Sequence, residues 1–141
     1  MQSVLKYPGS KGRVANWIVG HIPPHDFYVE PFFGSGAVLF AKPRSKAEVV
    51  NDLDGNVVNF FRVCRDAPEE LARALYLTPC SRSEYEEIQE IHAGQPMNMT
   101  GQPLEDARRF AIRCIQGAGT RIGQRTGWKK ETNSIVSNTA R

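Results

Sequence analysis

Cysteine is scarce in this sequence, and the few cysteines present are far apart. Three occur among 141 residues, at positions 64, 80 and 114. An odd, scattered set argues against a disulfide framework or a zinc knuckle. We therefore expect reduced, partly buried thiols. We expect no metal at His21 and His25 either, because Pro23 and Pro24 between them break the helix that this spacing would need.

Long apolar runs are also lacking. Hydrophobic residues make up 40% of the chain and alternate with charged ones, which is typical of a globular protein. The longest apolar stretches fall far short of a membrane-spanning helix. The first residues contain no basic segment followed by an apolar run, as a secretory signal would. These features predict a soluble, cytoplasmic protein with one compact core.

Acidic residues are nearly absent from both ends of the chain. The first 20 residues carry three basic side chains and no acidic one, and residues 117–141 carry five basic and one acidic. The net charge of +3 therefore hides an acidic middle. Basic ends fit a protein that meets a polyanion with particular surfaces. Ordinary solvated charge would explain the same pattern equally well.

The hydrophobic spacing predicts an α/β chain without repeats. A helix is expected over about residues 11–21, with Ser10 as its cap and the prolines at 23 and 24 as its end. Strands are expected over residues 27–30 and 47–52. A glycine turn and a short helix over residues 37–41 separate them, so the two strands are predicted to be parallel.

The remainder of the chain is predicted to be mainly helical. Asp54 can cap one helix, and Asp66 with Pro68 can open a second. Ser83 and Glu86 have the spacing of a capping box for a third, which would end near residue 94. A fourth is expected from about residue 104 to residue 116. The glycines at 117 and 119 end it and open a basic tail.

A glycine-rich turn, residues 30–36 (Glu-Pro-Phe-Phe-Gly-Ser-Gly), follows the first predicted strand. Parallel sheets bind nucleosides at such turns, and Gly34 and Gly36 would let a ligand approach the main chain. A dinucleotide fingerprint would place a small residue three positions after Gly36, where Leu39 stands. This departure favours a nucleoside without phosphates, such as S-adenosylmethionine. A purely structural turn would explain the same glycines.

An acid at the end of the second predicted strand could accept hydrogen bonds from the two ribose hydroxyls of a nucleoside. We prefer Asp52 for this role, because it directly follows the apolar strand residues. Leu53 could pack on the adenine. Asp54 is the rival acid, although its capping role accounts for it without a ligand.

The hexapeptide at residues 6–11 (Lys-Tyr-Pro-Gly-Ser-Lys) is the second candidate binding segment. Pro8 and Gly9 predict a turn into the first helix. Lys11 could pair with the carboxylate of the cofactor's methionine part, and the ring of Tyr7 could cover the sulfonium. A solvated lysine and a tyrosine packed under the turn are the alternative.

Three motifs in this order, residues 6–11, 28–36 and 51–54 (Asn-Asp-Leu-Asp), resemble the opening of Dam-type, or D12-class, adenine-N6 DNA methyltransferases. The resemblance is close over about the first 65 residues. It implies a Rossmann-like, S-adenosylmethionine-dependent fold with an incomplete sheet and a helical DNA-recognition segment. It also implies methyl transfer to adenine N6 in double-stranded DNA. The cofactor residues that it implies are Tyr7, Lys11, Phe33, Gly34, Ser35, Gly36, Asp52 and Leu53.

The resemblance also divides the chain. Residues 1–60 would form the cofactor-binding part, and residues 61–141 the helical and basic start of the target-recognition region. The implied DNA contacts are Arg121, Arg125, Lys129 and Lys130. Residues 124–129 are equally compatible with a surface loop anchored by Trp128.

The catalytic Asp-Pro-Pro-Tyr of that class is missing, because the only Pro-Pro lies between Ile22 and His25. No catalytic residue is therefore predicted. We expect a truncated product whose open sheet edge could bind a missing C-terminal part or a second copy. An inactive cofactor- or DNA-binding module is the alternative, and a nucleotide-dependent oxidoreductase is disfavoured by Leu39. The DNA site and the biological role, in restriction, replication marking or phage modification, are left open.

Overall fold

The computed structural model describes residues 4–91, 99–118 and 126–129 and divides the chain into two compact units. Unit 1 spans Met1–Leu53 and unit 2 spans Asp54–Arg141. Both helices and strands are present, which confirms the mixed α/β class. None of the described helices is long and apolar enough to cross a membrane. The functional division into residues 1–60 and 61–141 stays a prediction.

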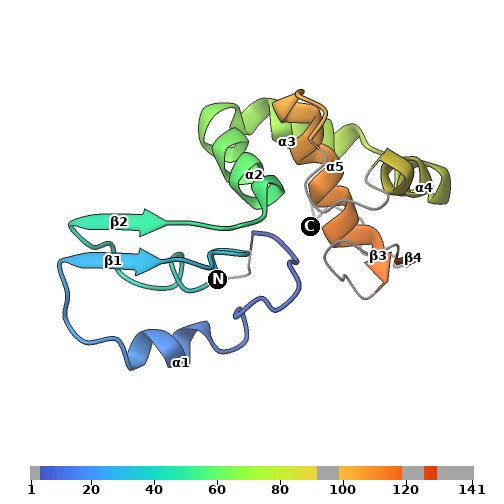
Figure 1. Ribbon diagram of the computed structural model, residues 1–141. Helices are drawn as coiled ribbons and strands as arrows, with labels where there is room; N and C mark the ends of the chain where they lie inside the picture. The colour runs from blue at the N-terminus through green and yellow to red at the C-terminus, as the bar shows by residue number, and fades with distance from the viewer. Residues whose placement is uncertain (1–3, 92–98, 119–125, 130–141) are drawn as a thin grey trace. The chain divides into compact units, whose positions relative to one another are not determined.

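The strands of unit 1 are parallel, as predicted. β1 (Phe27–Glu30) pairs with β2 (Ala47–Val50), and their arrowheads point the same way (Figure 1). Residue 28 lies opposite residue 48, and residue 30 opposite residue 50. Two further backbone hydrogen bonds, from Asn51 N to Glu30 O and from Phe33 N to Asn51 O, each 2.9 Å, continue the pairing. These bonds tie the chain that leaves β1 to the chain that leaves β2.

The helix of unit 1 is shorter than predicted. α1 spans Ala15–Gly20, with Val14 at the capping position, whereas residues 12–14 form turns. The predicted cap by Ser10 is therefore wrong. The Ser10 hydroxyl instead lies 2.8 Å from the hydroxyl of Ser35, 25 residues later. The same hydroxyl also accepts a local hydrogen bond of 3.4 Å from Gly12 N, but no helix begins there.

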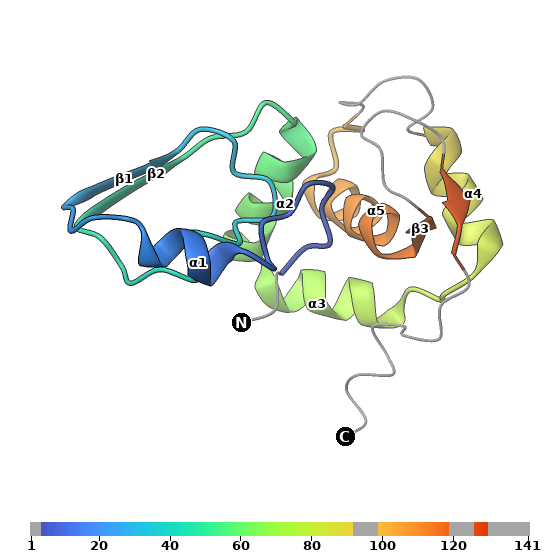
Figure 2. The same cartoon turned by 90° about the horizontal axis from the view of Figure 1, so that it is seen from below.

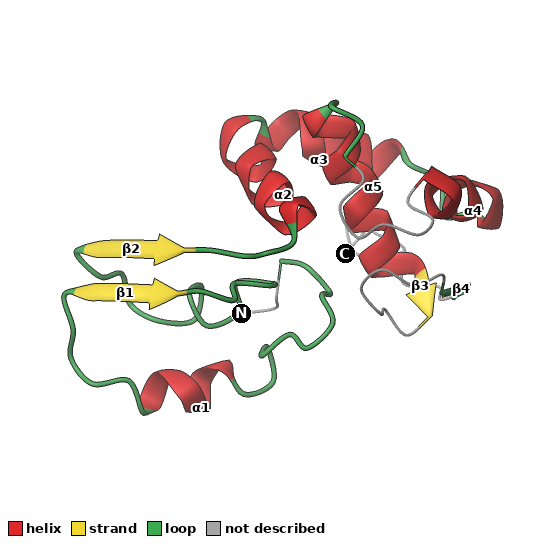
Figure 3. Cartoon of the chain, viewed as in Figure 1, coloured by secondary structure: helices red, strands yellow, loops and turns green. Residues whose placement is uncertain are grey.

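The short helix predicted over residues 37–41 is also wrong. Figure 3 draws the connection from β1 to β2 as loop, and residues 37–41 form turns. Backbone hydrogen bonds from Phe40 N to Gly36 O and from Ala41 N to Val38 O close these turns. Pro43 blocks any extension, because it lacks an N–H and disfavours helical geometry in the residue before it. So short a segment cannot offset the cost of helix nucleation.

Four helices build unit 2: α2 (Gly55–Asp66), α3 (Pro68–Leu77), α4 (Arg82–Ile91) and α5 (Pro103–Gln116). α5 contacts the other three and lies between them (Figure 2). Its buried residues Ala107, Phe110, Ala111 and Cys114 recur at helical spacing, which is the amphipathic pattern predicted for it. The Phe110 ring meets Phe60 of α2 edge to face, with centroids 6.1 Å apart. This contact joins the two helices.

The helix starts agree with the sequence in part. The Asp54 side chain accepts a hydrogen bond of 3.0 Å from Asn56 N and caps α2, as predicted. α3 has Pro68 in its first turn, as predicted. Its N-cap position, however, is occupied by Ala67 rather than by Asp66. α4 begins one residue after Ser81, whose hydroxyl accepts from Glu84 N at 3.2 Å. The capping box predicted two residues later is wrong, because the chain already turns at Pro79, whose carbonyl accepts from Ser81 N.

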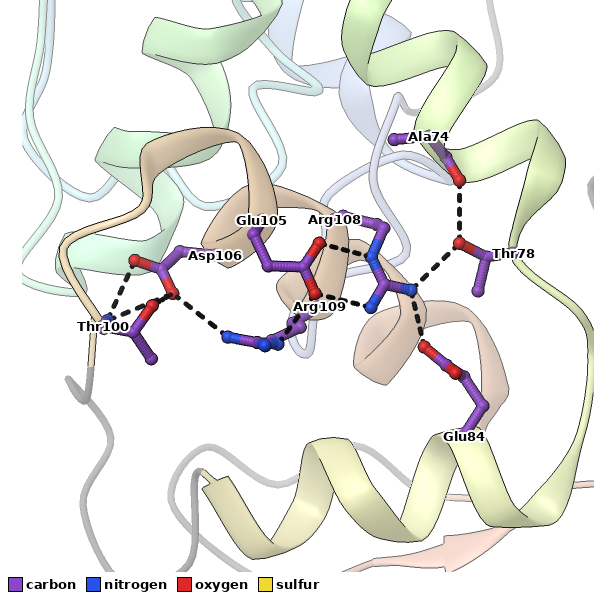
Figure 4. A network of polar contacts seen from close by, with 8 residues as sticks. All are labelled: Ala74, Thr78, Glu84, Thr100, Glu105, Asp106, Arg108 and Arg109. Carbon is purple, nitrogen blue, oxygen red and sulfur yellow. Dashed lines mark hydrogen bonds and ion pairs between the residues drawn. The ribbon is translucent and has the colours of Figure 1, made fainter.

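A network of ion pairs centred on Arg108 connects three of these helices (Figure 4). Its guanidinium donates to Glu105 on α5 and Glu84 on α4, at 2.6 to 2.8 Å, and to Thr78 Oγ1 at 3.0 Å. The Thr78 hydroxyl in turn donates to Ala74 O of α3. The hydrogen bonds to Glu105, together with those to Glu84, raise the pKa of Arg108 despite its partial burial. Arg108 therefore stays charged and links α3, α4 and α5.

A second sheet follows α5 directly. β3 (Gly117–Ala118) pairs antiparallel with β4 (Gly127–Trp128). Trp128 Nε1 donates to Gln116 Oε1 at 3.3 Å, and the buried hydroxyl of Tyr85 lies 2.6 Å from Thr126 Oγ1. These contacts hold β4 against α4 and α5. Sequence patterning did not predict this pairing.

Candidate functional site

A cavity of about 490 Å³ lies in unit 1, where the chain leaves β1 and β2. Its volume falls within the range of small-molecule sites. Three separate stretches line it: residues 7–11, the region of the glycine turn, and the residue two positions after β2. Six of the eight predicted cofactor residues are among its lining residues, namely Tyr7, Lys11, Phe33, Gly34, Ser35 and Asp52.

The glycine turn requires its glycines for backbone conformation and for space. Gly34 has φ +52° and Gly36 has φ +67°, both in the left-handed region that L side chains rarely adopt. A Cβ at Gly34 would lie 3.2 Å from Tyr7 Cδ1. A Cβ at Gly36 would lie only 2.5 Å from Phe33 Cζ. The Tyr7 ring thus lies close to Gly34, and the Phe33 ring lies close to Gly36.

Asp52 connects the end of β2 to the glycine turn. Its Oδ2 accepts a hydrogen bond of 2.7 Å from the backbone N–H of Gly34. A carboxylate has about four acceptor sites and can accept several hydrogen bonds at once. Asp54, the rival acid, caps α2 through its side chain in unit 2. The two neighbouring acids therefore differ in their contacts, and Asp52 is the one that lines the cavity.

The hexapeptide and the glycine turn are joined by the hydroxyl contact between Ser10 and Ser35. Ser35 is only 3% exposed, so this contact satisfies a buried hydroxyl. Lys11 is exposed, and its Nζ donates to Gly9 O at 3.2 Å. The ammonium of Lys11 can therefore meet an anionic group at little desolvation cost.

Glu30 also lines the cavity, although it was predicted only to begin the glycine turn and not to be a binding residue. It is the last residue of β1, and its Oε2 accepts a hydrogen bond of 3.1 Å from the hydroxyl of Tyr28. Partial burial raises the pKa of Glu30, while hydrogen bonds from Tyr28 and from the Leu39 backbone act in the opposite direction. An acid at the carboxyl end of a predicted strand was the signal that could have identified it.

The remaining predicted residues lie elsewhere. Gly36 and Leu53 are outside the cavity lining, and Leu53 is 83% exposed, so its contact with an adenine stays a prediction. Arg121, Arg125 and Lys130 lie outside the described residues. Lys129 is described and exposed, and its backbone N–H donates to Gln116 O at 2.8 Å.

His21, His25 and Cys114 have structural surroundings rather than those of a reactive site. His21 Nδ1 lies 2.7 Å from Trp17 O, and His25 Nε2 lies 2.9 Å from the hydroxyl of Ser45. The described part of the chain contains no group of three or more His, Cys, Asp or Glu placed to hold a metal ion. Burial raises the pKa of the Cys114 thiol to about 12, so this cysteine stays a protonated core residue.

Comparison with known proteins identifies a family whose model covers the residues that line this cavity. The model of the D12 class N6 adenine-specific DNA methyltransferases matches residues 7–120. The chain belongs to this family. The match includes all three stretches that line the cavity, and it confirms the resemblance noted in the sequence.

One relative is the Type II methyltransferase M1.LlaDCHI of Lactococcus lactis subsp. cremoris. This D12-class chain is 34% identical to it over 76 residues. The aligned stretch makes up 53% of the chain and 26% of the relative. The chain thus spans about a quarter of the length of this relative.

Proposed function

We propose that the cavity of unit 1 binds S-adenosylmethionine and that the protein transfers its methyl group to adenine N6 in double-stranded DNA. The observation that carries this proposal is the meeting of residues 7–11, the glycine turn and Asp52 around one cavity. Family membership supports the reaction. The parallel pairing of β1 and β2 supports a Rossmann-like arrangement, in which nucleosides bind at the carboxyl ends of the strands.

The chemistry of the lining residues suits the parts of this cofactor. Asp52 would accept hydrogen bonds from the ribose hydroxyls, and the exposed ammonium of Lys11 would pair with the carboxylate. The Tyr7 ring, which packs on Gly34, would face the sulfonium, because an aromatic face attracts a cation. When bound, S-adenosylmethionine supplies an electrophilic methyl group. Phe33 and Ser35 would shape the turn beneath it, and Leu53 would pack on the adenine.

DNA is the proposed macromolecular substrate. Lys129, together with Arg121, Arg125 and Lys130, would contact it, since clustered basic side chains bind phosphates and can read guanine edges. A target adenine would have to leave the stack to reach a cofactor. A role in restriction and modification fits the Type II relative, and a DNA substrate is consistent with a cytoplasmic location.

Calorimetry with the purified 141-residue chain tests the cofactor proposal. S-adenosylmethionine and its demethylated product, S-adenosylhomocysteine, should both bind. ATP should bind much more weakly, because Leu39, three positions after Gly36, stands where a pyrophosphate-binding fingerprint has a small residue. Circular dichroism establishes that the sample is folded. Folded protein that binds neither S-adenosylmethionine nor S-adenosylhomocysteine contradicts the proposal.

A further inference from the structure

A row of polar side chains crosses one face of the β1–β2 pair and ends at the cavity. Tyr28 and Glu30 are two residues apart in β1, so they share a face, and Glu48 lies directly opposite Tyr28 in the register. Lys42, from the connection between the strands, completes the row by contacting both Glu48 and Tyr28. The cavity-lining member is Glu30.

The Lys42 ammonium is nearly buried, with its side chain 2% exposed, and three groups compensate its charge. Its Nζ lies 2.5 Å from Glu48 Oε1, 2.8 Å from Pro43 O and 4.5 Å from the centroid of the Tyr28 ring. A buried cation with a carboxylate, a carbonyl and an aromatic face around it has little freedom to move. The Tyr28 ring is therefore held by a fixed charge on its face.

The hydroxyl at the other end of that ring donates to Glu30 Oε2 at 3.1 Å. Burial, together with the nearby carboxylates of Glu30 and Glu48, raises the pKa of Tyr28 to about 12. The phenol thus keeps its proton and remains a donor at physiological pH. Leu39 supplies a backbone hydrogen bond to the same carboxylate.

We propose that Tyr28 is a positioning residue for the cofactor cavity: clamped by Lys42, it fixes the Glu30 carboxylate where a cationic part of the ligand meets it. This inference rests on the proposed binding of S-adenosylmethionine, which carries an ammonium and a sulfonium. Both ends of the row contribute. Glu48 and Lys42 hold the ring, and the ring's hydroxyl holds the acid.

Tyr28→Phe is the direct test, with Tyr76→Phe as the matched control, because Tyr76 is a half-exposed tyrosine of α3 in the other unit. Binding of S-adenosylmethionine is measured by calorimetry from about pH 5 to about pH 8. Tyr28→Phe should weaken binding about fivefold at neutral pH, the size expected for the loss of one typical hydrogen bond. Tyr76→Phe should bind like wild type.

The pH profile separates positioning from a packing role. Removing the Tyr28 hydroxyl removes a hydrogen bond that lowers the pKa of Glu30. As the pH is lowered, Glu30 should therefore be protonated, and affinity should begin to fall, at a higher pH in Tyr28→Phe than in wild type. Lys11 and Asp52 also line the cavity, and their contributions are common to both proteins. In a Glu30→Gln background, Tyr28→Phe should cause no further loss. A loss that is equal at every pH and persists in that background overturns the inference.

Unchanged affinity and an unchanged pH profile in folded Tyr28→Phe also overturn it. If Tyr28→Phe does not fold, Lys42→Met serves instead, since it frees the ring but keeps the hydroxyl. It should shift affinity in the same direction by about twofold to threefold, and wild-type binding in folded Lys42→Met rejects the inference. Absence of binding in the folded wild-type chain is a different result, because it rejects the proposed function itself.

Discussion

The Asp52 carboxylate accepts a hydrogen bond of 2.7 Å from the backbone N–H of Gly34, which lies 18 residues earlier in the chain. One acid thereby organises the glycine turn and lines the cavity that the turn borders. Its two tasks can be separated by substitution, because an amide oxygen can still accept from Gly34 but offers fewer acceptor sites than a carboxylate.

Asp52→Asn should therefore keep the turn but weaken binding of S-adenosylmethionine about tenfold, and Asp52→Ala should weaken it further. Asp54→Ala is the control, because it removes the cap of α2. It should lower the free energy of unfolding by about 1 kcal/mol while leaving affinity nearly unchanged. Calorimetry and thermal unfolding measure the two effects. A larger loss of affinity in Asp54→Ala would mean that the wrong acid has been assigned.

Gly36→Ala should be strongly destabilising, because it combines a strained φ with a Cβ placed 2.5 Å from Phe33 Cζ and 2.7 Å from Phe40 Cε2. We expect a loss of about 3 kcal/mol in urea unfolding. Gly9→Ala is the matched control, since Gly9 has φ +74° and open space around its Cβ position. Strain alone should cost about 1 kcal/mol there. Equal losses at the two positions would show that contact with the two rings is unimportant.

Arg108→Met should destabilise unit 2, because it leaves the partly buried Glu84 without its guanidinium partner and leaves Glu105 with Arg109 alone. These side chains are 22% and 30% exposed, so we expect a loss near 2 kcal/mol, below the range for fully buried pairs. Arg65→Met, which breaks the exposed pair with Asp66, should change stability much less. Urea unfolding followed by circular dichroism compares the two variants. Similar losses would argue against a special role for the Arg108 network.

The same network predicts a pH dependence. The hydrogen bond from Arg108 lowers the pKa of Glu105 below its ordinary value of 4.5. A lowered folded-state pKa stabilises the protein above the unfolded-state pKa, and this stabilisation is lost as the pH falls through the folded-state value. The stability difference between wild type and Arg108→Met should thus be full above about pH 5 and shrink in more acidic solution. A difference that grows on acidification would contradict this assignment.

The elements that could be predicted from the sequence depend on local patterns. β1, β2 and α5 follow their hydrophobic spacing, and Asp54 caps α2 as a local side-chain contact. The cavity residues were identified by motif rather than by periodicity, and the structure brings six of them together. The link between Ser10 and Ser35 was not predictable in this way, because the capping pattern offered Ser10 an equally reasonable local partner.

The features that were missed depend on which elements face one another. β3 and β4 have two residues each, too few to show alternation, and they are held by contacts of Trp128 and Thr126 with helix residues. Nothing in the sequence distinguishes Arg108 from the other arginines, because its ion pair with Glu84 forms only when α4 and α5 pack together. Tyr28 became significant only when the strand register placed it between Lys42 and Glu30. Such pairings are tertiary information, which single-residue propensities do not contain.

The hydroxyl contact between Ser10 and Ser35 also has a thermodynamic consequence, because it joins two stretches that line the cavity and are distant in sequence. The unfolded chain cannot present both stretches to one ligand, so a ligand that bridges them binds only the folded form. Binding and folding of unit 1 are then linked by mass action. Saturation at about one hundred times Kd would add about 2.7 kcal/mol to the free energy of unfolding. The melting temperature of unit 1 should therefore rise with ligand concentration and serve as a binding assay in its own right.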